Sequence, residues 1–169
     1  MSSWDIGKPE AVEWVRKNVP KDADILDVGA CDGKWRNLLP DYPNMDAVEA
    51  YKPNASRIEK LYRKIYTRNV YCMEYERHYG LVIFGDVLEH MEVHQAQAVL
   101  AYAKEHADRI LVGVPFLYEQ GALGGNPFEI HVQHDLTAEL FAERYPGFSV
   151  LVQPSDRYCF YIWTKEMES

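Results

Sequence analysis

Short runs of apolar residues alternate along the chain with longer segments in which apolar side chains recur every three or four positions. A short apolar run bounded by turn residues is typical of a buried strand, and the longer spacing is typical of an amphipathic helix. The spacing predicts helices at residues 9–18, 34–39, 55–66, 92–107 and 135–145, the last with Thr137 as its N-cap. The apolar runs predict strands at residues 24–28, 45–50, 70–73, 81–84, 109–114, 148–152 and 158–164.

Strands and helices that alternate along a chain form a parallel sheet covered by helices on both faces. The last two predicted strands are joined only by residues 153–157, which are too few for a crossover connection. The final strand must therefore run antiparallel to its neighbour. We predict a single α/β domain over residues 1–169, a three-layer sandwich with a seven-stranded, mostly parallel sheet whose last strand is antiparallel.

Composition and charge narrow the class of protein. The chain has 169 residues with 26 acidic and 18 basic side chains, and the net charge of −8 disfavours nucleic acid as a partner. The cysteines Cys31, Cys72 and Cys159 form no Cys-x-x-Cys pair, which predicts reduced thiols. The sequence shows no secretory signal and no apolar stretch that could span a membrane, so we expect a cytoplasmic protein without membrane contacts.

Candidate ligand-binding residues follow the first two predicted strands. In an open α/β sheet, ligands bind beyond the carboxyl ends of the strands, where the strand order reverses. A turn of small residues after the first strand contains Gly29, Ala30 and Gly33, and glycines let the backbone approach a ligand closely. Glu49 and Ala50 end the second strand, and an acidic side chain there can accept hydrogen bonds from both hydroxyls of a ribose. These features predict a nucleoside-containing ligand.

The same turn departs from the G-x-G-x-x-G pattern of nicotinamide-binding domains. Cys31 and Lys34 stand at the second and third glycine positions of that pattern. The departure argues against a pyrophosphate resting on the turn, so a nicotinamide-dependent oxidoreductase is the least favoured function. A ligand with a ribose and no phosphate fits the turn better.

Three segments together resemble the class I S-adenosylmethionine-dependent methyltransferases. They are residues 25–33 (Ile-Leu-Asp-Val-Gly-Ala-Cys-Asp-Gly), 48–50 (Val-Glu-Ala) and 82–90 (Val-Ile-Phe-Gly-Asp-Val-Leu-Glu-His). The resemblance covers essentially the whole chain, including the reversed last strand. In the family's usual D-x-G-x-G-x-G motif, Cys31 replaces the middle glycine.

This resemblance implies S-adenosylmethionine as the cofactor, S-adenosylhomocysteine as the product, and a role for particular residues. It implies that Asp27 and Gly29 face the methionine part of the cofactor and that Glu49 holds the ribose. It further implies that Met73 and Glu74, after the third strand, frame the adenine. The backbone near Asp86 would complete the pocket.

The residues after the fourth predicted strand carry candidate chemistry. Asp86, Glu89 and His90 have the spacing that aims three side chains in one direction from a helical turn. Three interpretations stay open: a cap of the next helix, a substrate-positioning or acid–base group, and a set of metal ligands. The loop at residues 116–134 is long enough to predict a lid or binding loop, and it contains His131. A histidine there can take a proton from an attacking hydroxyl or amine, so we name Asp86, His90 and His131 as catalytic candidates.

A divalent metal is not expected but is left open. The stretch from Asp86 to His90 resembles subfamilies of O-methyltransferases in which an acid-x-x-Glu-His sequence holds Mg²⁺, sometimes with a later histidine. That resemblance implies Asp86, Glu89 and His90 as ligands, with His131 or His134 as the later one.

The leading functional hypothesis is therefore methyl transfer from S-adenosylmethionine to an oxygen or nitrogen nucleophile. The alternative from another class is a module that binds S-adenosylmethionine or S-adenosylhomocysteine without turnover. The methyl acceptor is not identified by the sequence. Because no separate cap domain is predicted, the acceptor site is either open to a large substrate or completed by a second subunit, as in a homodimer.

Overall fold

The computed structural model describes residues 4–168, so residues 1–3 and 169 of the expected domain lie outside the described residues. The helices are α1 (Lys8–Asn18), α2 (Lys34–Leu38), α3 (Lys52–Ile58), α4 (Val93–His106) and α5 (Ala138–Arg144). The strands are β1 (Ile25–Val28), β2 (Met45–Val48), β3 (Lys64–Tyr66), β4 (Leu81–Gly85), β5 (Arg109–Pro115), β6 (Ser149–Ser155) and β7 (Tyr158–Thr164). None of the helices in this part of the chain has the length and apolar composition needed to cross a membrane.

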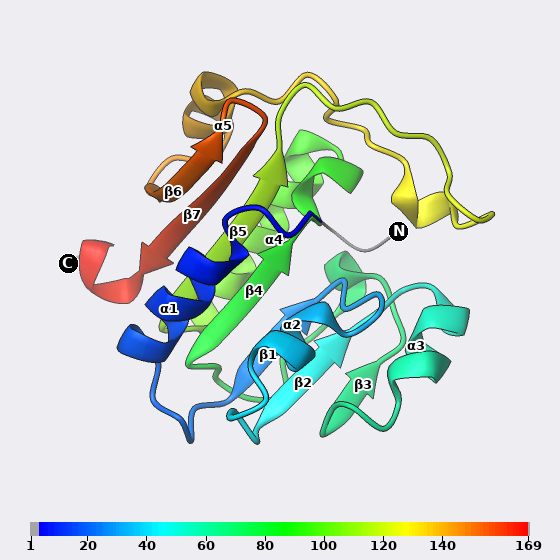
Figure 1. Ribbon diagram of the computed structural model, residues 1–169, viewed down its shortest axis with the longest axis vertical. Coiled ribbons are helices and arrows are strands. Elements are labelled where there is room, and N and C mark those ends of the chain that lie inside the picture. Colours follow the sequence, from blue (N-terminus) through cyan, green and yellow to red (C-terminus); the bar gives the residue numbers. More distant parts are fainter. Residues whose placement is uncertain (1–3, 169) are drawn as a thin grey trace.

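The strands form one seven-stranded sheet in the order β3-β2-β1-β4-β5-β7-β6 (Figure 1). β7 runs antiparallel to both of its neighbours, β5 and β6, while the remaining neighbouring strands are parallel. The predicted fold class, a mostly parallel sheet with one reversed last strand, is confirmed. The strand order reverses between β1 and β4, and this is the place where open α/β sheets bind ligands.

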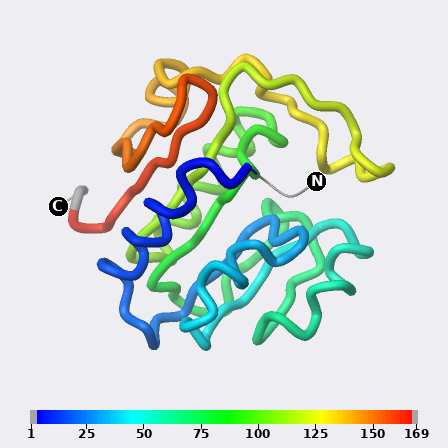
Figure 2. The backbone as a smooth tube through the Cα atoms, viewed as in Figure 1, coloured from blue at the N-terminus to red at the C-terminus, as the bar shows by residue number. Residues whose placement is uncertain are grey.

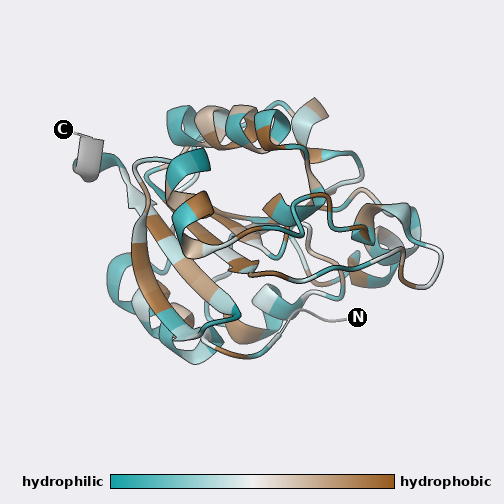
Figure 3. Ribbon diagram, turned by 90° about the horizontal axis from the view of Figure 1, so that it is seen from above, coloured by the Kyte–Doolittle hydropathy of each residue, from teal (hydrophilic) through white to brown (hydrophobic). Residues whose placement is uncertain are grey.

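Alternate residues of each central strand pack against different helices, because successive side chains point to opposite faces. Leu26 and Val82 belong to the core under α4 and α5, whereas Ile25 and Leu81 belong to the core under α1 and α2. Both cores are apolar, so the central strands are buried on both sides, and Figure 3 shows hydrophobic colour on the strands. The helix–sheet–helix layering that the hydrophobic pattern predicts is therefore present.

The third strand differs from the prediction. The predicted helix 55–66 ends at Ile58, the strand β3 covers Lys64–Tyr66, and the predicted strand 70–73 is a short 3₁₀ turn, η1 (Val70–Cys72). Helical spacing of the apolar residues in this segment is also compatible with a turn that leads into an edge strand. Pairing with β2, which joins Asp46 to Lys64 and Val48 to Tyr66, decides between the two.

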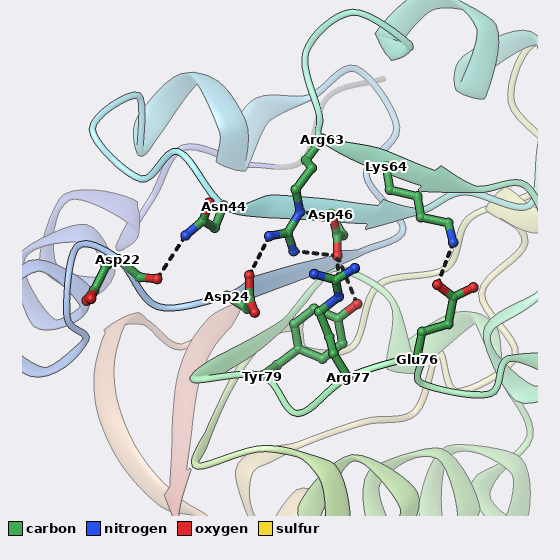
Figure 4. A network of polar contacts seen from close by, with 9 residues as sticks. All are labelled: Asp22, Asp24, Asn44, Asp46, Arg63, Lys64, Glu76, Arg77 and Tyr79. Carbon is green, nitrogen blue, oxygen red and sulfur yellow. Dashed lines mark hydrogen bonds and ion pairs between the residues drawn. The ribbon is translucent and has the colours of Figure 1, made fainter.

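A network of hydrogen bonds and ion pairs links the start of β3 to β2 (Figure 4). Asp46 is fully buried, and Arg63 donates two hydrogen bonds to its carboxylate, each 2.8 Å long. Arg63 also donates to Asp24 at 2.6 Å, and the hydroxyl of Tyr79 donates to Asp46 at 3.1 Å. Arg77 lies 3.5 Å from the same carboxylate. A buried carboxylate needs such partners to be tolerated, and here they hold the chain in the register of β3.

Candidate functional site

A pocket of about 250 Å³ opens at the carboxyl ends of β1, β2, β4 and β5. Each of these strands contributes its last or nearly last residue to the wall: Val28, Val48, Gly85 and Pro115. The loop after β5 covers one side, and Figures 1 and 2 show this loop extending beyond the sheet at the same edge. The pocket thus lies where the strand order reverses, as the sequence predicts for a ligand site.

The turn after β1 forms the first wall. Gly29 and Ala30 line the pocket, and their backbone N–H groups donate to the carbonyl of Val48 at 2.8 and 3.2 Å. Gly29 has a φ of 69°, and a Cβ atom there would lie 2.7 Å from Val87. Cys31 has a φ of 49°, a left-handed conformation that glycine adopts at little cost. The backbone at Cys31 therefore keeps the shape that the missing glycine would have had.

Glu49 forms the second wall with Ala50. Its side chain is 6% exposed and accepts hydrogen bonds from the backbone N–H groups of Cys31 and Tyr51, both at 2.8 Å. Burial raises the pKa of Glu49, and the two N–H donors oppose this rise. Each carboxylate oxygen has two lone pairs, so both oxygens retain the capacity to accept a further hydrogen bond from a ligand.

Two predicted cofactor residues, Asp27 and Gly33, do not line the pocket. Asp27 is buried behind the turn, where its carboxyl accepts a hydrogen bond of 2.5 Å from the hydroxyl of Tyr62. Gly33 has a φ of 78° and precedes α2, and a Cβ there would lie 2.7 Å from Leu61. Both residues therefore shape the turn from behind the pocket wall.

Met73 and Glu74 also lie outside the pocket wall. Their predicted role at the adenine depended on a third strand at residues 70–73, whereas the third strand of the structure is β3 at Lys64–Tyr66. Met73 is buried in the core under α4, and Glu74 is exposed. The segment that follows β3 is residues 67–71, and Arg68, Asn69, Val70 and Tyr71 line the pocket. One residue in the sequence could have indicated that a turn begins here, namely Asn69. Its side chain caps η1 by accepting a hydrogen bond from the N–H of Tyr71 at 3.4 Å.

Asp86 lies on the pocket wall in a left-handed conformation, with a φ of 59°. Its carboxylate accepts a 2.7 Å hydrogen bond from the hydroxyl of Tyr158 and lies 3.7 Å from Nζ of Lys8. Lys8 is only 2% exposed and also donates to the carbonyl of Trp4. Burial lowers the pKa of Lys8, and the negative charge of Asp86 opposes this change. Lys8 was missed by the sequence analysis, because a lysine near the start of an amphipathic helix is usually solvated.

Glu89, His90 and His131 come together beside the pocket, with one ligand atom from each lying within 4.8 Å of the others. Glu89 and His90 belong to the 3₁₀ turn η2 (Leu88–His90), and His131 comes from the loop after β5. That loop is fastened to η2, because the N–H groups of Val132 and Gln133 donate to the carbonyl of Glu89 at 2.8 and 2.9 Å. Two candidate residues that follow the fourth strand and one from the loop after β5 therefore lie together.

The two imidazoles are oriented by backbone carbonyls. Nδ1 of His90 lies 3.1 Å from the carbonyl of Ile130, and Nδ1 of His131 lies 2.7 Å from the carbonyl of Tyr118. A carbonyl only accepts, so in the neutral ring of His131 Nδ1 carries the proton and Nε2 has a free lone pair. His90 has a second contact, with the backbone of Asp86, and its Nε2 lies 4.0 Å from Oε1 of Glu89. Burial lowers the pKa of both histidines, which keeps them neutral over a wider pH range.

Glu89 is the most constrained carboxyl of the group. It is 1% exposed, and neither of its carboxylate oxygens has a hydrogen-bond partner among the described residues. Burial, with the nearby charge of Asp86, raises the pKa of Glu89 well above its ordinary value. A buried carboxyl without partners is costly unless it is protonated or paired with a cation.

The structure separates two other candidates from this group. Asp86 is held by Tyr158 and Lys8 and is not one of the three clustered ligands, and His134 is exposed and also lies outside the cluster. The buried residue between the two loop histidines is Gln133, which donates to the carbonyls of Leu88 and Met91 at 2.8 and 3.0 Å. Gln133 thus fixes the turn that carries Glu89, a role that no sequence pattern had indicated.

The sequence and the structure were each compared with those of known proteins, and only the structure has matches. The sequence matches no protein-family profile and no curated protein. A methyltransferase from Clostridium acetobutylicum that depends on S-adenosylmethionine superposes with a TM-score of 0.71 at 12% identity, covering 91% of this chain and 88% of its own. The complex of DhpI with SAM and HEP gives a TM-score of 0.73 at 15% identity, covering 92% and 84%.

The glycopeptide N-methyltransferase MtfA, complexed with S-adenosylhomocysteine, gives a TM-score of 0.65 at 13% identity and covers 96% of this chain and 91% of its own. At such identities the likeness concerns the fold. This chain has the class I fold of S-adenosylmethionine-dependent methyltransferases.

Proposed function

We propose that this protein binds S-adenosylmethionine and transfers its methyl group to an oxygen or nitrogen nucleophile. The observation that carries the proposal is the pocket at the switch point, whose wall contains both the Gly29 turn with Glu49 and the cluster of Glu89, His90 and His131. A site that only bound a nucleoside would not need the second group. The non-catalytic module is therefore the less favoured alternative.

The residues present fit the cofactor. The turn at Gly29 leaves no room for a side chain, and Glu49 offers acceptors for ribose hydroxyls. Ala30 and Ala50 line the same wall without bulk, and the backbone near Asp86 closes it. In place of Met73 and Glu74, we propose that Asn69 and Val70 flank the adenine, because they follow β3 and line the pocket. When bound, S-adenosylmethionine supplies an activated methyl group on a sulfonium.

The chain's own part in the reaction is to position the acceptor and remove its proton. The neutral imidazole of His131, with Nδ1 held by Tyr118, has a free Nε2 that can accept that proton. His90 lies beside it, with ring centroids 4.7 Å apart, and its Nδ1 is held by the carbonyl of Ile130. The aromatic rings of Tyr118 and Phe128 line this side of the pocket and can contact an acceptor.

Cofactor binding is tested by calorimetry with S-adenosylmethionine, S-adenosylhomocysteine and NAD. We expect Glu49→Ala to weaken binding of the first two by about 1–3 kcal/mol, the usual loss when buried hydroxyl partners go unpaired. Glu59→Ala, an exposed glutamate just past the end of α3, is the matched control, and thermal unfolding checks that both variants fold. Unchanged affinity in Glu49→Ala, or tighter binding of NAD, would contradict the assignment.

Catalysis is tested with radiolabelled cofactor and a panel of hydroxyl and amine acceptors. We expect His131→Ala to leave cofactor affinity nearly unchanged and to lower turnover by about 10²–10⁴-fold, the usual contribution of a positioned base. Turnover should fall at low pH, as the imidazole becomes protonated. His134→Ala, the exposed neighbour outside the cluster, is the matched control. If the two variants lose activity equally, His131 is not the base.

A second candidate role for the cluster is to hold a divalent cation. The carboxylate of Glu89, which has no hydrogen-bond partner among the described residues, and the free Nε2 of His131 favour it, because ligating histidines typically donate their other N–H to a carbonyl. One carboxylate and two imidazoles suit Mn²⁺, Zn²⁺ or Fe²⁺ better than Mg²⁺, which prefers oxygen ligands. A bound cation would polarise an acceptor oxygen and make its proton easier to remove.

Metal binding is measured by calorimetry with Mn²⁺ or Zn²⁺ on chelator-treated protein. We expect saturable binding that Glu89→Gln weakens by more than about 10-fold, while His134→Ala leaves it unchanged. If the cation is required for turnover, chelator should abolish activity and the cation restore it. Activity that survives chelation would leave His131 as the base and remove the metal from the mechanism.

A further inference from the structure

The basic residues of this acidic protein are unevenly distributed. The segment 52–68 contains six of the 18 Lys and Arg residues and only one of the 26 Asp and Glu residues. Its net charge is therefore +5, against −13 for the rest of the chain. We refer to these six side chains as the basic edge; they are Lys52, Arg57, Lys60, Arg63, Lys64 and Arg68.

The basic edge follows the outer border of the sheet. It includes residues of α3, of the turn after α3, and of β3, which is the last strand on that side. All six residues are exposed. A groove of about 620 Å³ runs between α3 and β3, and its lining includes three basic residues, one acidic residue and two hydroxyl-bearing ones: Lys52, Arg63, Lys64, Glu59, Ser56 and Thr67. Cationic groups and hydroxyls in one groove are the donors that phosphate oxygens accept from.

Most of this charge is not neutralised within the protein. Arg63 is paired with Asp46 and Asp24, and Lys64 with Glu76 at 2.5 Å. Within residues 4–168, the other four members have no carboxylate within 4.0 Å, although Arg57 donates to the amide oxygen of Asn54. These four are Lys52, Arg57, Lys60 and Arg68. Exposed cations that are not paired internally are available to an external anion.

The basic edge is continuous with the pocket. Arg68 lines the pocket, and Lys52 follows Ala50, another residue of the pocket wall, by two positions. Arg57 is near enough to act on Glu49, whose pKa its positive charge lowers against the larger effect of burial. A chain lying along α3 and β3 would therefore reach the mouth of the pocket with one end.

We propose that the basic edge binds the phosphodiester backbone of a single-stranded nucleic acid, whose end enters the pocket as the methyl acceptor. The inference rests on the proposed function for its last step only. The rest of the chain has a net charge of −13, and this negative charge disfavours a duplex, which brings a second phosphate backbone, more than it disfavours a single strand. The overall charge of −8 predicts weak binding of nucleic acid in general, and the uneven distribution is what makes a single strand the exception.

The test is the binding of a fluorescent oligothymidylate of about 20 nucleotides, longer than the ~4–16 nucleotides that one compact domain covers. Anisotropy is measured on the full chain at two salt concentrations, about 50 mM and about 150 mM. The variant is Lys52→Glu with Lys60→Glu. The control is Lys17→Glu with Lys165→Glu, which makes the same change in net charge at two exposed lysines outside the basic edge.

We expect binding that weakens with salt, and a loss of more than about 10-fold in the Lys52 and Lys60 variant at the lower salt concentration. The dependence of log affinity on log salt should also fall by about 1.4, or ~0.7 for each lost phosphate contact. No binding at the lower salt concentration, an equal loss in the control variant, or tighter binding of a duplex of the same length would each overturn the proposal.

Calorimetry with S-adenosylhomocysteine separates this inference from the proposed function. The Lys52 and Lys60 variant should bind S-adenosylhomocysteine as the unmodified protein does, because neither lysine lines the pocket. If the protein binds the oligonucleotide along the basic edge but not the cofactor, the proposed function fails and the basic edge stands. If it binds the cofactor and not the oligonucleotide, the reverse holds.

Discussion

Replacing Asp27 by asparagine should change how the free energy of unfolding depends on pH. Asp27 begins the glycine-turn motif and is 1% exposed. Burial, with the nearby charges of Glu49 and Asp32, raises the pKa of its carboxyl from 3.8 to about 7, while the hydrogen bond from Tyr62 opposes the rise. The folded protein therefore holds this proton more tightly than the unfolded chain does.

The sign and size of the effect follow from the two pKa values. Stability from this group is fully present below pH 3.8 and is lost as the pH rises to 7, because the unfolded chain releases the proton first. Each unit of difference corresponds to about 1.4 kcal/mol, so the full loss is about 4 kcal/mol. The amide side chain of the Asp27→Asn variant cannot ionise. The variant's free energy of unfolding relative to the wild type should thus increase with pH across this range and level off above it.

The assay is urea unfolding of both proteins at several pH values between these limits. A constant offset of either sign is expected, because the amide N–H₂ replaces an oxygen that has no hydrogen-bond partner among the described residues. Only the change with pH is diagnostic. Tyr62→Phe is a second variant, and removing its O–H should raise the pKa of Asp27 further and extend the pH-dependent range upward. A difference between Asp27→Asn and wild type that stays flat with pH would refute the reasoning.

Two further predictions concern stability, and both are checked by urea unfolding. Arg63→Ala should cost about 2–4 kcal/mol, because it leaves the buried carboxylate of Asp46 without its bidentate partner. Lys64→Ala breaks a pair that lies on the surface and should leave the free energy of unfolding nearly unchanged; equal losses would contradict the burial argument. Gly85→Ala should cost about 1–3 kcal/mol, because its Cβ would collide with Nε1 of the buried Trp35, and an unchanged stability would show that Trp35 can move aside.

Local patterns were sufficient for most of the fold. The run Leu81–Phe84 and the five-residue connection before the last strand predicted a buried parallel strand and an antiparallel one, and both are present. The reason is that these signals are strong and short in range: apolar residues that are continuous must be buried, and a short connection allows one direction only. Thr137 as the cap of α5 is confirmed in the same way, since its hydroxyl accepts from the N–H of Leu140 at 3.2 Å.

Local patterns predicted the wrong secondary structure where contacts with residues distant in sequence determined it. The segment 59–66 has the apolar spacing of a helix. Its last residues instead form β3, because they pair with the edge of β2 and because Arg63 hydrogen-bonds to the buried carboxylate of Asp46. The position of the third strand also affects the site: Met73 and Glu74, which were predicted to follow this strand at the pocket, lie outside the pocket wall, and residues 68–71 line it.

The sequence by itself determined the layered α/β fold and the edge of the sheet where the pocket opens. It also indicated Gly29, Glu49 and the pairing of Glu89 and His90 with His131, because motif spacing and strand ends are properties of a continuous chain. Only the tertiary structure decided which carboxyls have other residues of the protein as hydrogen-bond partners and which do not. Asp27 lies behind the turn with Tyr62, Asp86 is held by Lys8 and Tyr158, and Glu89 has no hydrogen-bond partner in the described part of the chain. Burial and hydrogen-bond partners arise from residues far apart in the chain, and they alone set these roles.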